Sequence, residues 1–202
     1  MKLRYSPTSP FVRKVVVAAH EAGVAARIAR EPTDVWANDA ILVDNPLGKV
    51  PALVTDDGVF VGSFACCDYL QALPGARRLI PDHGAARWRV MQMHGLADGA
   101  MEAAVAYVIE TLRRPEPFIY PGALDRQIGK IVRTIAALEI RADDLEPHAT
   151  APDLGAITTA CTLAYLDFRL AGKIDWRAQA PRLAAFYAPF AQRSSMRDTA
   201  PA

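Results

Sequence analysis

The two halves of this chain differ in their expected secondary structure, and this difference constrains the fold more than any single motif. Residues 1–76 alternate short strand-like and helix-like pieces, whereas from about residue 86 the sequence consists of long, alanine-rich helical stretches. We therefore expect a mixed α/β domain at 1–76, a linker at 77–86 and an all-helical domain at 87–202. A chain of 202 residues is long enough to bury a sizeable core.

The first half has the predicted order β-α-β-α-β-β-α. The first crossover implies a parallel pair of strands, and a later hairpin adds antiparallel strands, which gives a mixed four-stranded sheet. Ser63 is expected to open the last helix of this half, and Pro74-Gly75 to end it. The expected elements are a strand at 2–5, a helix from Pro10 that stops at Gly23, a strand at 25–30, an irregular helix or loop at 34–44, a hairpin at 52–62 with Asp57-Gly58 in its turn, and a helix at 63–73.

The second half predicts three long helices, at 84–114, 127–145 and 150–172. The third is apolar on all sides and is expected to be central. It opens with Thr150 and Asp153 at a spacing similar to that of a capping box. Met93 and Met101 recur at helical spacing and are read as core residues.

Composition excludes several classes of function. A net charge of +1 gives no indication of a basic surface for binding nucleic acid. No apolar run reaches the roughly 18 residues of a membrane span, and the N-terminus lacks the apolar core of a signal peptide, so a cytoplasmic protein is expected. The three cysteines and four histidines show no metal-ligand spacing, which predicts neither a metal site nor a disulfide framework.

Ser9 raises the main chemical question. It directly precedes Pro10 and an apolar run, so it is a candidate N-cap. The N-terminus of a helix also favours an anion, and a hydroxyl there can face a substrate, with Thr8 as the nearest rival. Arg13 and Lys14 follow on the same helix, where a positive charge would help to hold an anion, although such residues more often form a solvated face.

Five features follow one another along the chain: SPF at 9–11, NPLGKVPAL at 45–53, the Asp-Gly hairpin, Ser63 at a helix start, and the Thr150-x-x-Asp153 cap. Together and in this order they resemble the cytosolic glutathione transferase superfamily, and the segment TSPFVRK is most similar to its small bacterial members. The resemblance implies an N-terminal thioredoxin-like domain, a C-terminal helical bundle, a homodimer and glutathione as co-substrate. A thioredoxin-like Cys-Pro-x-Cys pair is missing, because Ser9 and Val12 occupy its positions, so disulfide exchange is not expected.

The resemblance also implies roles for individual residues. Ser9 would contact the sulfur of glutathione and favour its thiolate. Val50, before a cis Pro51, would pair its backbone with the cysteinyl part, and Lys49 would meet the glycine carboxylate. Ser63 would hold the γ-glutamyl carboxylate.

Position 62 departs from the family pattern. The family usually places Glu or Asp before the helix-opening serine, and this chain has Gly62. Asp98 is a conceivable substitute across a dimer interface, although a solvated helix residue is the simpler reading. Phe11 is expected either to line the electrophile pocket or to belong to the core.

The resemblance therefore implies a transferase that attacks a halide, an epoxide or an activated alkene with the glutathione thiolate, as in detoxification. A glutathione-dependent isomerase is an alternative, but the loop before the first helix lacks the cysteine typical of that branch. A non-catalytic binding or scaffold protein on the same fold is the other alternative, and Gly62 is the feature that favours it.

Overall fold

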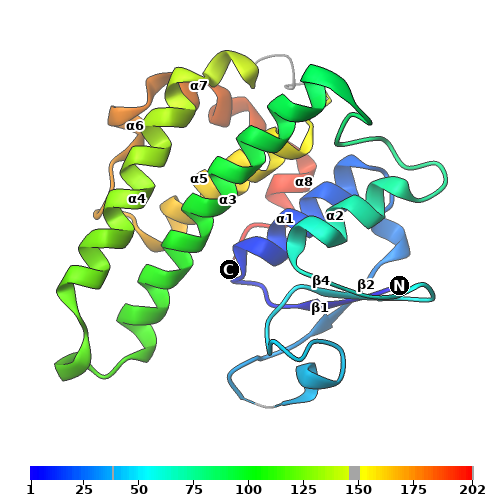
Figure 1. The fold of residues 1–202 in the computed structure, drawn as a ribbon, viewed down its shortest axis with the longest axis horizontal. Helices are drawn as coiled ribbons and strands as arrows, with labels where there is room; N and C mark the ends of the chain where they lie inside the picture. Colours follow the sequence, from blue (N-terminus) through cyan, green and yellow to red (C-terminus); the bar gives the residue numbers. More distant parts are fainter. Residues whose placement is uncertain (38, 146–150, 202) are drawn as a thin grey trace. The chain divides into compact units, whose positions relative to one another are not determined.

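A computed structural model describes residues 1–37, 39–145 and 151–201 of the chain. The chain forms two compact units (Figure 1), the first comprising residues 1–82 together with 193–202 and the second comprising residues 83–192. The expected fold class is confirmed, with a four-stranded mixed sheet in the first unit and a helical second unit.

The sheet of the first unit has the strand order β2-β1-β3-β4. Strand β1 pairs in parallel with β2 and antiparallel with β3, and β3 pairs antiparallel with β4. The hairpin turn consists of Asp56 and Asp57, so Gly58 opens the next strand rather than lying in the turn as expected. The strands are β1 (Lys2–Tyr5), β2 (Ala29–Pro32), β3 (Ala52–Thr55) and β4 (Gly58–Val61).

Helices α1 (Pro10–Glu21) and α2 (Ser63–Ala72) lie on the same face of this sheet (Figure 1). Gly23 follows α1 with φ of 78°, a conformation that favours glycine and ends the helix as predicted. The strand expected at 25–30 begins later, because Ala25–Arg27 form the 3-10 turn η1. The 34–44 segment contains only the short 3-10 helix η2 (Ala40–Val43).

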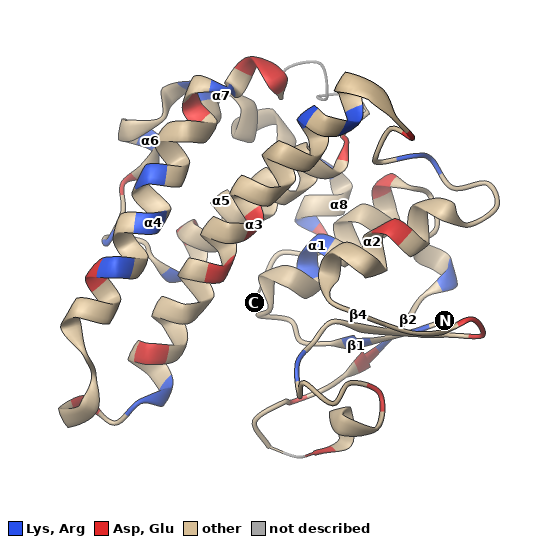
Figure 2. Cartoon of the chain, in the orientation of Figure 1, with Lys and Arg blue, Asp and Glu red and all other residues tan. Residues whose placement is uncertain are grey.

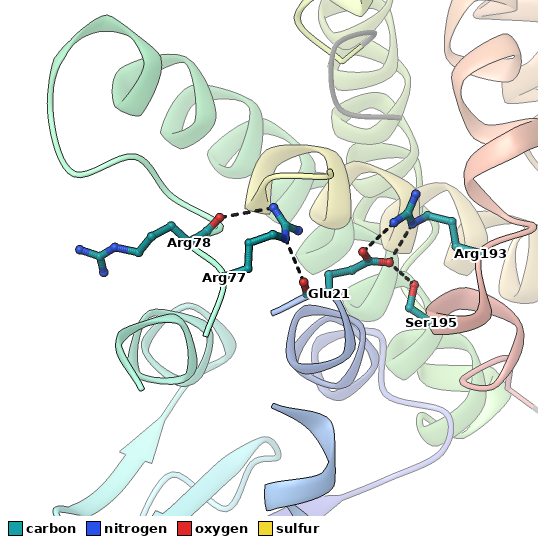
Figure 3. A network of polar contacts seen from close by, with 5 residues as sticks. All are labelled: Glu21, Arg77, Arg78, Arg193 and Ser195. Carbon is teal, nitrogen blue, oxygen red and sulfur yellow. Dashed lines mark hydrogen bonds and ion pairs between the residues drawn. The ribbon is translucent and has the colours of Figure 1, made fainter. Parts of the chain in front are cut away.

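The C-terminal segment, residues 193–201, packs along α1 and contains the short helix α8 (Ser194–Arg197). Near the end of α1, the Glu21 carboxylate accepts hydrogen bonds from the Arg193 guanidinium at 2.8 Å and from the Ser195 hydroxyl at 2.6 Å (Figure 3). Near the start of α1, Arg13 donates to Thr199 Oγ1 at 3.3 Å. The sequence pattern gave no sign that this segment belongs with the first half of the chain.

The second unit is built on three long helices, α3 (Gly84–Arg113), α4 (Pro121–Ile140) and α5 (Leu154–Arg169). The central position expected for α5 is confirmed, because all its residues from Leu154 to Leu166 are buried. The predicted capping box is corrected, since Asp153 is itself the N-cap and accepts from Ala156 N at 2.8 Å, while Thr150 lies outside the described residues. The remaining elements of this unit are η3 (Glu116–Phe118), η4 (Ala142–Asp144), α6 (Trp176–Gln179) and α7 (Pro181–Phe190).

Helix α4 carries charges of both signs, with three cations between an aspartate near its start and a glutamate near its end (Figure 2). Among the described residues, no helix is both long and apolar enough to cross a membrane.

Candidate functional site

The strand register brings three segments to one edge of the sheet. Arg4 lies opposite Ala52, and Ala52 lies opposite Val61, so the residues just beyond these pairs adjoin one another. The N–H of Gly62 donates to the carbonyl of Pro51 at 3.4 Å, which continues the hairpin by one step. The loop before α1, the Val50-Pro51 peptide and the start of α2 therefore meet at this edge.

Ser9 is the N-cap of α1, as predicted. Its backbone is extended, with φ of −79° and ψ of 119°, and its Oγ accepts from the N–H of Val12 at 3.3 Å. The hydroxyl proton has no acceptor among the residues that the structure describes. A capping hydroxyl uses its oxygen as acceptor and keeps its proton as donor, so Ser9 can cap the helix and donate to a ligand at once.

Thr8 shares this chemistry. It is half-buried like Ser9, and its side chain has no hydrogen bond in the described part of the chain. The geometry brings both hydroxyls to the start of α1 and leaves the choice between them open.

The Val50-Pro51 peptide is cis, as the resemblance implied. Neither the N–H nor the C=O of Val50 has a hydrogen-bond partner within the described residues. Backbone groups in this state can pair with an extended ligand, in the manner of an added strand. Lys49 is exposed and forms no ion pair in the described chain.

Asn45 holds this loop in place, a role that our reading of the sequence missed. Its side chain is only 1% exposed; Nδ2 donates to the carbonyl of Lys49 at 2.7 Å, and Oδ1 accepts from the N–H of Leu47 at 3.0 Å. The signal was available, because an asparagine before Pro46 and Gly48 is typical of a turn that an Asx side chain closes.

Ser63 opens α2, and Gly62 is its N-cap. Gly62 has φ of 84° and ψ of 138°, and it provides no side chain to cap the helix. Ser63 is only 6% exposed, yet neither its hydroxyl nor its N–H has a partner among the described residues. Residues 58–67 carry no charged side chain (Figure 2), so this helix start provides donors without a nearby carboxylate in sequence.

The expectation of a solvated face at Arg13 and Lys14 is wrong for Lys14. Lys14 is 0% exposed, and its Nζ lies 5.8 Å from the centroid of the Phe11 ring. Arg13 is half-buried and donates through Nη2 to the carbonyl of Met196 at 2.9 Å. Phe11 is half-buried in the first turn of α1, and a pocket-lining role for it remains a prediction.

Both cysteines of this unit, Cys66 and Cys67, are buried thiols in α2. Burial raises the pKa of Cys66 to about 12, although backbone hydrogen bonds and the charge of Lys14 act in the opposite direction. The Cys66 thiol is therefore protonated at neutral pH.

Two further expectations concern the rest of the chain. Asp98 lies half-buried on α3 in the second unit, and its assignment to the site stays a prediction. No cluster of three or more potential metal ligands exists among the described histidines, cysteines and carboxylates.

Comparison with known proteins decides the family. Residues 8–73 match the model for the N-terminal domain of glutathione S-transferases, and residues 121–188 match the model for the C-terminal domain. The chain is also 33% identical over 203 residues to the uncharacterized GST-like protein YibF of Escherichia coli strain K12, covering 100% of this chain and 98% of YibF. The chain belongs to the glutathione transferase family.

Solved structures of glutathione transferases agree with this assignment. A family member from Pseudomonas fluorescens Pf-5 with bound glutathione is 41% identical, covers 100% of this chain and 98% of its own, and has a TM-score of 0.92. A structure from the same organism with bound S-(propanoic acid)-glutathione is 40% identical over 100% of both chains, with a TM-score of 0.88. Transferase relatives of the same length and fold therefore bind glutathione and an S-conjugate of it.

Proposed function

We propose that this family member is a glutathione transferase in which the Ser9 hydroxyl stabilises the glutathione thiolate for attack on an electrophile. The observation that carries the proposal is the state of Ser9: its oxygen caps α1 at 3.3 Å, and its proton has no acceptor in the described chain. The same sheet edge presents the open backbone of Val50 and the open N-terminus of α2.

Each part of glutathione finds a complementary group in this arrangement. The N–H and C=O of Val50 would pair with the cysteinyl backbone, next to Pro51. The N–H and hydroxyl of Ser63 would hold the γ-glutamyl carboxylate at the positive end of α2. Lys49, exposed in its loop, would meet the glycine carboxylate.

The energy required of Ser9 is modest. A free thiol has a pKa of about 8.5, and lowering it by about two units takes roughly 2.7 kcal/mol. One hydrogen bond to a charged acceptor supplies about 1.5–3 kcal/mol, and a helix N-terminus adds about 0.3–1 kcal/mol. The thiol proton would leave to solvent, and the sulfur would form a bond to carbon as a halide leaves, an epoxide opens or an alkene takes up a proton.

The bound S-(propanoic acid)-glutathione of the Pseudomonas relative supports an electrophile of the activated alkene kind. Adding a thiol across the double bond of acrylate would give such a conjugate. A homodimer, a cytoplasmic location and a role in detoxification belong to this proposal as expectations from the family.

The test is a binding and turnover experiment on the purified protein. Calorimetry should show glutathione binding, and the protein should accelerate conjugation of glutathione to acrylate or to an activated aryl chloride. Ser9→Ala should keep binding while losing most of the acceleration. An absence of acceleration with both electrophiles, despite binding, would contradict the proposal.

A second candidate is a binding protein without catalysis, and Gly62 is the observation that favours it. The γ-glutamyl ammonium finds no carboxylate in residues 58–67. Glutathione binding with an unshifted thiol pKa is the result expected of this candidate.

A further inference from the structure

An ion-pair network joins the central strand β1 to the loop of the candidate site. Arg4 Nε donates to Asp44 Oδ2 at 2.6 Å, its Nη2 lies 2.5 Å from the same oxygen, and its Nη1 lies 2.9 Å from Glu31 Oε2. The side chains of Arg4 and Asp44 are 26% and 14% exposed, so solvent screens their pair only in part. None of these three residues has a role in the proposed glutathione contacts.

The network lies on the face of the sheet away from α1 and α2, where the segment that carries η2 runs (Figure 1). Arg4 reaches Asp44 on this side, whereas Leu3, which the alternation of a strand places on the other face, is 0% exposed. Glu31 stands opposite Arg4 in the parallel pair of β1 and β2. The strand register therefore brings both carboxylates to one guanidinium.

The segment between β2 and β3 depends on side chains for its position. The described part of residues 34–51 contains η2 as its only regular element, and within that part no strand pairs with the sheet. Ile41 is 1% exposed and anchors the segment through apolar contact, which is not directional. The ion pair at Asp44 is directional, because two guanidinium nitrogens approach one carboxylate oxygen. It therefore fixes how the chain enters the next turn.

That next turn is the one that presents Val50. Asp44 directly precedes Asn45, whose Nδ2 donates to the carbonyl of Lys49 at 2.7 Å. The bonds thus continue from Arg4 through Asp44 and Asn45 to the residue before Val50. Arg4 itself lies in the strand that leads into the loop before α1. One guanidinium therefore relates the two loops that meet at the edge of the sheet.

We propose that the ion pair of Arg4 and Asp44 positions the turn at 45–49, so that Lys49 and the backbone of Val50 can meet glutathione. This inference rests on the glutathione binding of the proposed function and not on the thiolate role of Ser9. Both members of the pair are positioning residues, because they act through the turn and do not touch the ligand. Losing the pair weakens binding in the ground state and the transition state alike, so the affinity falls while kcat stays.

The experiment measures the dissociation constant of glutathione by calorimetry, and kcat with an activated aryl chloride at saturating glutathione. We expect Arg4→Met and Asp44→Ala each to raise the dissociation constant about tenfold and to keep kcat within about twofold of the parent. The double variant should also be about tenfold weaker, because both changes remove the same pair, whereas independent effects would multiply to about 100-fold. Asp44→Asn keeps an acceptor without the charge and should be about threefold weaker.

Glu21→Gln is the matched control. It weakens another ion pair of the same unit, with Arg193, at the opposite end of α1 from Ser9. Its dissociation constant should equal that of the parent. A comparable loss of affinity in this control would show that any ion pair removed from the unit weakens binding, and would overturn the positioning role.

The other outcomes separate this inference from the function on which it rests. If the parent binds glutathione without conjugating it, the transferase proposal fails, while tenfold weaker binding in the single variants still supports the role of the pair. Parental affinity in Arg4→Met and Asp44→Ala, with or without a lower kcat, overturns that role alone. If Arg4→Met does not fold, the two Asp44 variants decide in the same way. A parent that does not bind glutathione overturns both.

Discussion

The side-chain amide of Asn45 donates a hydrogen bond to the carbonyl oxygen of Lys49 across 2.7 Å, while its oxygen accepts from the N–H of Leu47. These two bonds close the turn that presents Val50. Because Asn45 is only 1% exposed, the loop geometry depends on a buried side chain that does not itself reach the ligand.

Asn45→Ala should therefore weaken glutathione binding. We expect the dissociation constant to rise about tenfold and the free energy of unfolding to fall by about 1–3 kcal/mol, because buried groups lose their partners. Calorimetry and urea denaturation measure the two effects. Asn45→Asp keeps the acceptor for Leu47 and loses the donor to Lys49. Its affinity and stability should therefore lie between those of the parent and those of Asn45→Ala. Parental affinity in Asn45→Ala would show that the turn plays no part in binding.

Gly62→Asp should have two opposed effects. A side chain at φ of 84° and ψ of 138° is strained, which lowers the free energy of unfolding by about 1–3 kcal/mol, although a Cβ there meets no atom within 4 Å. The new carboxylate would meet the γ-glutamyl ammonium. Gly62→Ala is the matched control, because it has the strain without the charge. We expect the Asp variant to bind glutathione about tenfold more tightly than the Ala variant. Equal affinities would mean that the ammonium is recognised elsewhere.

Glu21 makes the stability of the first unit depend on pH. Burial alone raises its pKa, but hydrogen bonds from Arg193 and Ser195 and the charges of Arg193 and Arg77 outweigh this, so its pKa is lowered from 4.5 (Figure 3). A lowered folded-state pKa gives stability that is complete above the unfolded value and is lost as pH falls through the folded one.

The stability difference between the parent and Glu21→Gln should therefore be largest at neutral pH and shrink as the medium becomes acidic. Urea denaturation at several pH values measures it. Glu102→Gln serves as the control, because Glu102 is exposed and has no partner in the described chain. A difference that stays constant with pH would contradict this account of Glu21.

Gly155 allows α5 to approach α3 closely. A Cβ at this position would lie 2.9 Å from Met93 Cβ and 3.2 Å from the carbonyl of Val90. Gly155→Ala should lower the free energy of unfolding by about 1–3 kcal/mol through overpacking. Gly99→Ala on exposed α3 surface, where nothing lies within 4 Å, should raise it by about 0.5–1 kcal/mol. Thermal unfolding of the two variants measures both changes. Equal shifts of the melting temperature, with the same sign, would be inconsistent with close packing at Gly155.

The sequence predicted those features that local rules determine. Ser9 before Pro10 signals a helix start, and the hairpin and α2 follow from turn and capping residues. The chain order of these signals indicated the fold class. The burial of Lys14 was not predictable, because an Arg-Lys pair reads as a solvated face until tertiary packing is known.

Two other features were missed or only partly predicted. The pairing of Glu21 with Arg193 joins residues 172 positions apart, and no local pattern announces it. The cap of α5 was placed on Thr150 and Asp153 together, whereas Asp153 alone provides the described cap. Spacing rules locate helix starts only to within a few residues.

The central claim is that the Ser9 hydroxyl stabilises a thiolate while capping α1. The most direct test follows the thiolate absorbance of bound glutathione across pH in the parent and in Ser9→Ala, with Thr8→Val as the control for the rival hydroxyl. The account predicts a lowered thiol pKa in the parent and in Thr8→Val, and a return toward about 8.5 in Ser9→Ala. A bound thiol whose pKa stays lowered in Ser9→Ala, or is never lowered in the parent, would contradict it.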